Sequence, residues 1–171
     1  QDVVYPQPVF DKVHEKANMT RLQKTEWAQP AIGAVSLSHL GLLADLGVTA
    51  DVVGGHSFGE ITALHHAGVF SADDMIRIAR KRGELMAEAA KVPGAMTAVP
   101  RTLEVVKPFV DAIEGVVLAN HNGPTQIVLS GATDAIEAVE AALQAQDIPP
   151  KRLRVATAFH SPVVSPSTEP F

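Results

Sequence analysis

The chain has 171 residues, of which 46% are hydrophobic and 19% are charged, and its formal net charge is −5. This composition suits one compact unit or two small lobes with a real core, and it excludes a disordered chain. The chain contains no cysteine, which excludes a disulfide scaffold, a thiolate zinc site and a cysteine nucleophile. No apolar run reaches the length of a membrane helix, no signal peptide is visible, and the acidic balance argues against nucleic acid. We therefore expect a soluble, cytoplasmic α/β protein with neither a membrane nor a nucleic-acid partner.

The first half of the chain predicts helices around one short strand. Pro30 is expected at the start of a helix over residues 31–46, because its missing N–H has no intrahelical partner at that position. Residues 49–54 predict a strand centred on two valines, which leads directly into a glycine-bounded serine turn. A helix is expected over 61–69, and another opens at Ser71, which can cap it.

Residues 94–155 predict a different arrangement. Strands are expected at 94–99, 116–120, 126–130 and 152–155, with helices at 103–113 and 132–146. The order β-α-β-β-α-β is the ferredoxin-like pattern, which forms one antiparallel sheet with two helices on one face.

The segment Gly55-His56-Ser57-Phe58-Gly59 matches the G-x-S-x-G pattern of a nucleophile elbow, with a predicted strand before it and a helix after it. The turn is expected to be too tight for a side chain at Gly55 or Gly59 and to hold Ser57 in a strained conformation. The following helix then aims its positive end at the serine hydroxyl, and the N–H of Phe58 becomes an oxyanion donor. The same pattern also occurs in ordinary glycine-bounded turns, so both interpretations stay open at this point.

A serine nucleophile needs a base, and the chain has seven histidines. His65 and His66 lie in the helix after the elbow, where packing or solvent contact is the usual role, and His121 is placed near a turn. His160 ends an extended segment and precedes Ser161 and a proline, so it can reach across a cleft. It is the favoured candidate among the seven.

Arg82 interrupts the apolar stripe of its helix. Helical spacing places it on the same face as Ala79 and Met86. A guanidinium buried without an anion is unfavourable, so a partner is expected. The sequence leaves two alternatives open: a structural role, as a core ion pair or a snorkelling side chain, or a substrate carboxylate that Arg82 grips with two parallel hydrogen bonds.

Five segments occur together in order: Gln29-Pro-Ala31, Gly55-His-Ser-Phe-Gly-Glu60, Arg82-Gly-Glu-Leu-Met86, Asn120-His-Asn-Gly-Pro-Thr-Gln126 and Ala158-Phe-His-Ser-Pro162. Together they resemble the malonyl-CoA:acyl-carrier-protein acyltransferase family, most of all the acyltransferase domains of type I iterative polyketide and polyunsaturated fatty acid synthases. The resemblance covers nearly the whole chain. It implies an α/β-hydrolase-like core over residues 1–93 and 156–171, with a ferredoxin-like subdomain inserted over 94–155, and a chain truncated at both ends.

The resemblance also implies an enzyme that loads a malonyl extender unit in polyketide or fatty acid synthesis. Ser57 would carry the acyl group as an ester in a ping-pong reaction, His160 would be the general base, and Arg82 would bind the malonyl carboxylate. The remaining implied roles are support of the arginine by Gln29, substrate contact by His56, cleft lining by Asn120 and Asn122, and selection of malonyl over methylmalonyl units by Phe159. The implied partners are malonyl-CoA, an acyl carrier protein domain and neighbouring synthase domains, with no metal and no bound cofactor.

Two other functions share part of this pattern. A serine hydrolase such as a thioesterase has the elbow and the histidine, but Arg82 and the inserted lobe argue against it. A non-catalytic docking fragment of a multienzyme is disfavoured because Ser57 and His160 are both present. An acidic carrier protein is expected to dock on basic residues that equally suit a solvated helix face, namely Arg77, Arg80, Lys81, Lys151 and Arg152.

Overall fold

The computed structural model describes residues 2–89, 91–155 and 157–171. The chain divides into two compact units, Gln1–Ala87 with Phe171 and Glu88–Pro170. Among the described residues, no helix combines the length and the apolar character that a membrane crossing requires.

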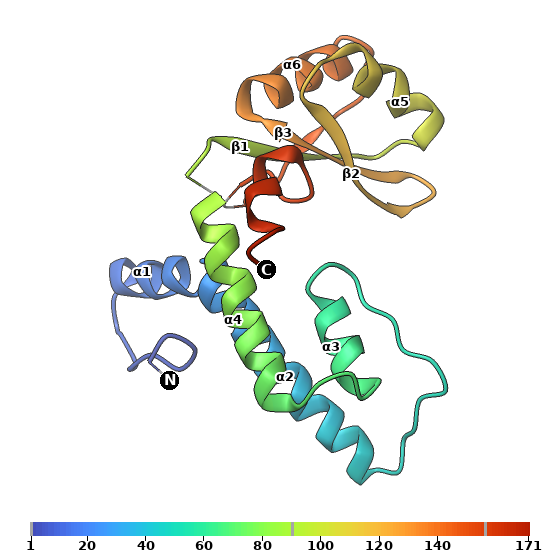
Figure 1. Cartoon of the computed structure of the whole chain (residues 1–171). Coiled ribbons are helices and arrows are strands. Elements are labelled where there is room, and N and C mark those ends of the chain that lie inside the picture. Colours follow the sequence, from blue (N-terminus) through green and yellow to red (C-terminus); the bar gives the residue numbers. More distant parts are fainter. Residues whose placement is uncertain (1, 90, 156) are drawn as a thin grey trace. The chain divides into compact units, whose positions relative to one another are not determined.

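The first unit consists of helices joined by irregular segments (Figure 1). The N-terminus of α4 has the predicted cap: Ser71 Oγ accepts a hydrogen bond from the Asp74 N–H at 3.1 Å and donates one to the Asp74 carboxylate at 2.7 Å. A small core forms where Phe58, Met75 and Ala79 are buried together. The helices of this unit are α1 (Lys12–Leu22), α2 (Thr25–Asp45), α3 (Gly59–His66) and the greater part of α4 (Ala72–Ala89).

The helix expected to begin at Pro30 begins earlier, so this proline lies inside α2. Proline has no N–H to donate to the carbonyl of Glu26, one helical turn before it. Arg80 Nη1, from α4, donates to that carbonyl at 3.0 Å. A contact with another helix thus supplies the missing donor, and the local proline signal did not reveal it.

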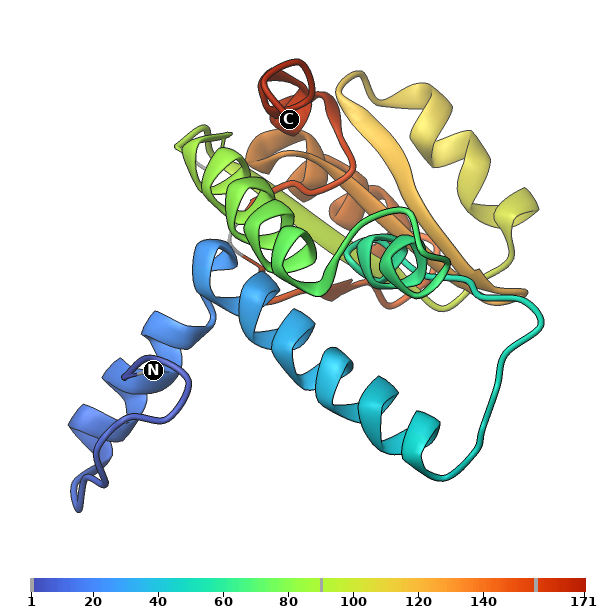
Figure 2. The same ribbon diagram turned by 60° about the horizontal axis from the view of Figure 1, so that its bottom comes forward.

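The strand predicted over residues 49–54 does not form. After α2 the chain runs without regular secondary structure until α3 begins at Gly59 (Figure 2). Val52 is 88% exposed, and Val53 is exposed as well. A strand requires a neighbour for its backbone hydrogen bonds, and within the described part of the chain no segment pairs with these valines.

The second unit is a four-stranded antiparallel sheet in the order β2-β3-β1-β4. Helices α5 and α6 pack against each other and against the same face of this sheet (Figure 1). The strands are β1 (Gly94–Val99), β2 (Val116–Gly123), β3 (Gln126–Ala132) and β4 (Lys151–Arg152), the helices are α5 (Leu103–Ala112) and α6 (Thr133–Gln144), and a 3₁₀ helix, η1 (Pro162–Ser167), follows. The predicted order of strands and helices is confirmed, although β4 is shorter than the predicted strand over 152–155.

The core of the second unit lies between its helices and its sheet. Alternate residues of the central strands point toward α5 and α6, which contribute the apolar residues of one face each. The fully buried side chains of this core are Val99, Val106, Ile127, Leu129, Ile136, Val139 and Leu143. The expected alternation of strands and amphipathic helices therefore builds a packed layer here.

Candidate active site

The backbone at Ser57 is strained, as predicted. Its φ angle is 54°, in the left-handed region that non-glycine residues rarely adopt. The N–H groups of Gly59, Glu60 and Ile61 donate to the carbonyls of His56, Ser57 and Phe58 at 2.9, 3.1 and 3.0 Å, so the turn passes directly into α3. The serine consequently lies at the positive end of a helix.

The two glycines of the motif have different roles. A Cβ at Gly55 would lie 2.1 Å from the carbonyl carbon of Gly59 and 2.3 Å from the Glu60 nitrogen, so no side chain fits there. A Cβ at Gly59 would meet nothing within 4 Å. The expectation that both positions are too tight is therefore correct for Gly55 and wrong for Gly59, because only Gly55 faces the backbone of the following turn.

A pocket of about 580 Å³ adjoins the turn within the first unit. Its apolar wall comes from α2, through Ile32 and Leu40, and from Val53. Both Ser57 and His56 line it, and substrate contact by His56 stays a prediction. His66, which the sequence assigned to packing or solvent, also lines this pocket.

Phe58 anchors the turn to the two long helices. Its side chain is buried with Met75 and Ala79 of α4. A Cβ at Gly33 of α2 would lie 3.3 Å from the Phe58 ring and 3.4 Å from the Met75 methyl group, so α2 also packs closely here. The face of α4 that holds the turn continues, by helical spacing, to Arg82.

Arg82 is half-buried and donates from Nη1 to Gln29 Oε1 at 2.8 Å. Burial lowers the pKa of its guanidinium, and the negative charge of Glu60, in the first turn of α3, acts in the opposite direction. Within the described part of the chain Arg82 forms no ion pair. A structural ion pair with a core acid, one of the two alternatives left open by the sequence, is therefore not supported.

Gln29 is buried, and hydrogen bonds fix its amide group at both ends. Its Nε2 donates to Thr25 Oγ1 at 2.6 Å and to Met86 Sδ at 3.4 Å, which leaves Oε1 to accept from Arg82. The support of the arginine by Gln29, implied by the resemblance, thus has a direct contact behind it. Thr25 was not among the predicted site residues, because its only signal in the sequence is its position one helical turn before Gln29.

The other predicted site residues belong to the second unit. Asn120 is half-buried and Asn122 exposed, both on β2, whose pairing with β3 shifts register between Leu118 and Asn120 and again between His121 and Gly123. Phe159 is half-buried, and His160 is exposed. Their roles in the reaction stay predictions.

His160 lies in a tight turn rather than at the end of a strand. Its φ angle is 57°, and apart from Ser57 and Asp147 no other described non-glycine residue has a positive φ. Ser161 Oγ donates to the Ala158 carbonyl at 2.7 Å and caps η1. Left-handed backbone in non-glycine residues concentrates at functional sites, and both predicted catalytic residues have it.

Most of the basic residues expected to dock a carrier protein are paired within the chain. Arg80 Nε donates to Glu84 at 2.6 Å. Arg152 donates to both carboxylate oxygens of Glu140 at 2.8 and 2.6 Å. These contacts lower the positive charge offered to a partner, and docking at this group stays a prediction.

No cluster of three or more histidine, aspartate or glutamate side chains that could hold a metal ion occurs among the described residues. The chemical groups gathered in the first unit are therefore a strained serine at a helix N-terminus and a half-buried guanidinium beside a glutamine.

Comparison with protein families identifies this arrangement. The model of the acyl transferase domain matches residues 1–170. The chain belongs to the acyl transferase domain family. The resemblance drawn from the five sequence segments is thereby confirmed.

Known proteins similar to this acyl transferase domain include one curated synthase and two solved structures. Mycoketide-CoA synthase of Mycobacterium tuberculosis is 42% identical over 150 residues, which is 88% of this chain and 4% of that protein. The acyltransferase domain of the iterative polyketide synthase in enediyne biosynthesis superposes with a TM-score of 0.80 at 36% identity, over 84% of this chain and 38% of that one. The malonyl CoA-acyl carrier protein transacylase of Clostridium perfringens has a TM-score of 0.82 at 35% identity, over 87% of this chain and 49% of that one.

The chain spans less than half the length of each of these relatives. The structural matches show a mixed α/β fold of the acyltransferase type.

Proposed function

We propose that this acyl transferase domain moves a malonyl group from malonyl-CoA, through an ester on Ser57, to an acyl carrier protein. The observation that carries the proposal is the occurrence, in one unit, of a strained serine at the start of α3 and a half-buried guanidinium held by Gln29. The similarity to polyketide synthases and to a malonyl CoA-acyl carrier protein transacylase supports the choice of substrate and acceptor.

In the first half-reaction, the hydroxyl oxygen of Ser57 attacks the thioester carbonyl carbon of malonyl-CoA. His160 takes the hydroxyl proton, and the carbonyl oxygen gains negative charge as a tetrahedral intermediate forms. The N–H of Phe58, the amide directly after the serine, donates to that oxygen. The carbon–sulfur bond then breaks, and the departing CoA sulfur takes the proton from His160.

In the second half-reaction, the thiol of the carrier protein attacks the malonyl ester on Ser57. The same histidine takes the thiol proton and returns it to the serine oxygen as the ester bond breaks. Ser57 is thereby regenerated, and no electron acceptor or bound cofactor is needed.

Arg82 provides the selectivity for a diacid. A malonyl group on Ser57 carries a free carboxylate at its far end, which a guanidinium can bind with two parallel hydrogen bonds. Gln29 holds the guanidinium through one nitrogen, Nη1. We assign substrate contact to His56, lining of the site to Asn120 and Asn122, and the preference for the smaller malonyl unit to Phe159.

We also propose the fold type of each of the two parts of the chain. The strand order and the two helices on one face support a ferredoxin-like subdomain over residues 94–155. The strained turn before α3 supports an α/β-hydrolase-like core. We assign residues 1–93 and 156–171 to that core, although the second compact unit of the structure extends from Glu88 to Pro170. The limit at residue 156 lies outside the described residues.

Acylation of the protein tests this function. The intact chain is incubated with malonyl-CoA, and its mass is measured before and after. The wild-type protein should gain one malonyl group, and Ser57→Ala should gain none. Labelling that persists in Ser57→Ala contradicts the assignment of the nucleophile.

A further inference from the structure

We propose that Arg80 is a positioning residue that keeps Gln29, and through it Arg82, aligned for a substrate carboxylate. This inference rests on the proposed function and adds a residue to it.

Pro30 leaves one carbonyl of α2 without its helical donor. In a regular helix the N–H of residue 30 would donate to the Glu26 carbonyl, and proline has no N–H. The Glu26 carbonyl instead accepts from Arg80 Nη1 at 3.0 Å, in a partly buried position. Arg80 therefore closes the helical turn that contains Gln29.

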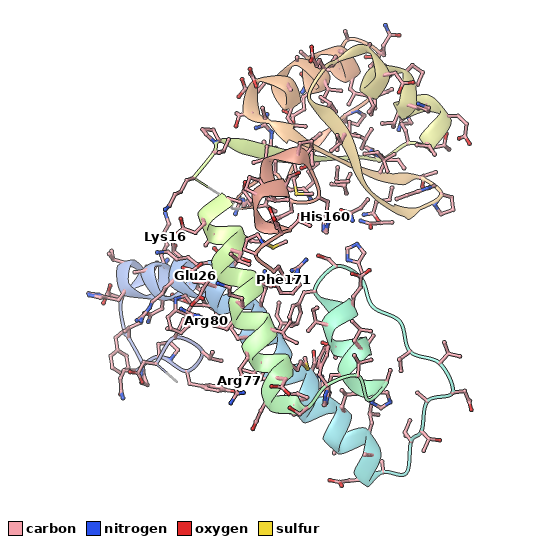
Figure 3. The ribbon with its side chains drawn as sticks, viewed as in Figure 1. Lys16, Glu26, Arg77, Arg80, His160 and Phe171 are labelled. Carbon is pink, nitrogen blue, oxygen red and sulfur yellow. The ribbon has the colours of Figure 1, made fainter. Side chains whose placement is uncertain are left out.

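Two further contacts orient the Arg80 guanidinium. Its Nε donates to Glu84, one turn further along α4, at 2.6 Å. Its central carbon lies 4.5 Å from the centre of the Trp27 ring, where a cation is attracted to the aromatic face. Figure 3 shows Arg80 of α4 directed toward Glu26 of α2. A planar group held on three sides by Glu84, Trp27 and the carbonyl has little freedom to turn.

The turn of α2 that Arg80 closes also contains Gln29, the residue that binds Arg82. Thr25 and Gln29 flank Glu26 and Trp27 in α2, and their side chains are joined by the hydrogen bond at 2.6 Å. At the same point α4 touches α2 backbone to backbone, since a Cβ on Gly83 would lie 2.5 Å from the Thr25 carbonyl oxygen. Opening the turn at Glu26 would therefore shift the Gln29 oxygen that accepts from Arg82.

The experiment compares the malonyl-to-acetyl loading ratio of Ser57 in four proteins: wild type, Arg80→Met, Pro30→Ala and the double variant. Alanine at position 30 returns an N–H to the Glu26 carbonyl, so it can replace the donor that Arg80→Met removes. Lys107→Met is the matched control, because Lys107 is 62% exposed, has no assigned role in the site, and like Arg80 donates to a carboxylate four residues further along its helix, that of Asp111 at 2.7 Å. Hydrogen–deuterium exchange over residues 25–33 gives a second measurement that does not depend on acylation.

We expect Arg80→Met to lower the ratio by about threefold to tenfold, the range given by the loss of one net hydrogen bond. It should also speed exchange over residues 25–33. In the Pro30→Ala background, Arg80→Met should change the loading ratio and the exchange rate by less than about half as much on a logarithmic scale. Lys107→Met should change neither quantity. Recovery of folding in the double variant, should Arg80→Met alone unfold, also supports the inference.

An unchanged ratio with unchanged exchange in folded Arg80→Met overturns the inference. An equal loss of the loading ratio when Arg80→Met is made in the wild type and in Pro30→Ala also overturns the inference. So does failure of both Arg80→Met and the double variant to fold, since the alanine amide should make the arginine donor dispensable. A wild-type chain that is never acylated contradicts the proposed function instead, and the exchange measurement still decides whether Arg80 holds the turn.

Discussion

Replacement of Gly83 by alanine tests whether close contact between α4 and α2 builds the site. A Cβ at this position would lie 2.5 Å from the Thr25 oxygen, 2.7 Å from the Glu26 Cα and 2.9 Å from the Thr25 carbonyl carbon. All three are backbone atoms, which cannot rotate away as a flexible side chain would. The two helices must separate for the methyl group to fit.

The expected free energy combines two opposing effects. Alanine is favoured over glycine within a helix by about 1 kcal/mol. Overpacking against a rigid neighbour costs about 1–3 kcal/mol, and contacts this short with backbone belong to the upper half of that range. Gly83→Ala should therefore destabilise the protein by about 1–2 kcal/mol.

Gly41 provides the matched control, because it lies inside α2 and a Cβ there would meet nothing within 4 Å. Gly41→Ala should stabilise the chain by about 0.5–1 kcal/mol. Urea unfolding followed by circular dichroism measures both variants, and the malonyl-to-acetyl loading ratio should fall in Gly83→Ala alone. A Gly83→Ala protein as stable as Gly41→Ala would refute the reasoning about helix contact.

Three further predictions concern charged and titratable groups. Arg82→Ala should reduce malonyl loading by at least tenfold while acetyl loading stays the same or rises, because a charged hydrogen bond contributes about 1.5–3 kcal/mol and acetyl has no carboxylate; an unchanged ratio in the folded variant would assign Arg82 a structural role. His160→Ala should slow acylation of the chain by about 10²–10⁴-fold, the usual effect of a positioned base, and a larger loss in His66→Ala would show that the wrong histidine was chosen. Arg152 lowers the pKa of the Glu140 carboxyl by hydrogen bonding to it. The pair therefore stabilises the fold at pH values above the ordinary glutamate pKa of about 4.3. This stabilisation is lost as the pH falls through the lowered pKa of Glu140 in the folded protein. Arg152→Gln should thus cost about 0.5–1 kcal/mol in urea unfolding at neutral pH and close to nothing in strong acid; an equal cost at both pH values would contradict the charge argument.

The second unit could be predicted from sequence because its signals are local. The strand character of residues 94–99 and 126–130 and the amphipathic spacing of 132–146 predict these elements. The structure forms them at Gly94–Val99, Gln126–Ala132 and Thr133–Gln144. The strained conformation at Ser57 was likewise predictable from the glycine pattern and the helix that follows.

The remainder depends on contacts between segments far apart in the sequence. Pro30 looked like a helix start because nothing nearby indicates that Arg80 would supply its missing donor. The valines at 52–53 have strand character, but a strand also needs a paired neighbour. For the same reason spacing showed that Arg82 faces inward without showing that Gln29 is the group it contacts.

A single-turnover transfer experiment tests the central claim most directly. The chain is loaded with malonyl-CoA, separated from free CoA compounds and mixed with an acyl carrier protein that bears its thiol arm, and the masses of both proteins are followed. The account predicts that the malonyl group leaves Ser57 and appears on the carrier in equal amount. Release of free malonate with an unmodified carrier would contradict it and would indicate a hydrolase.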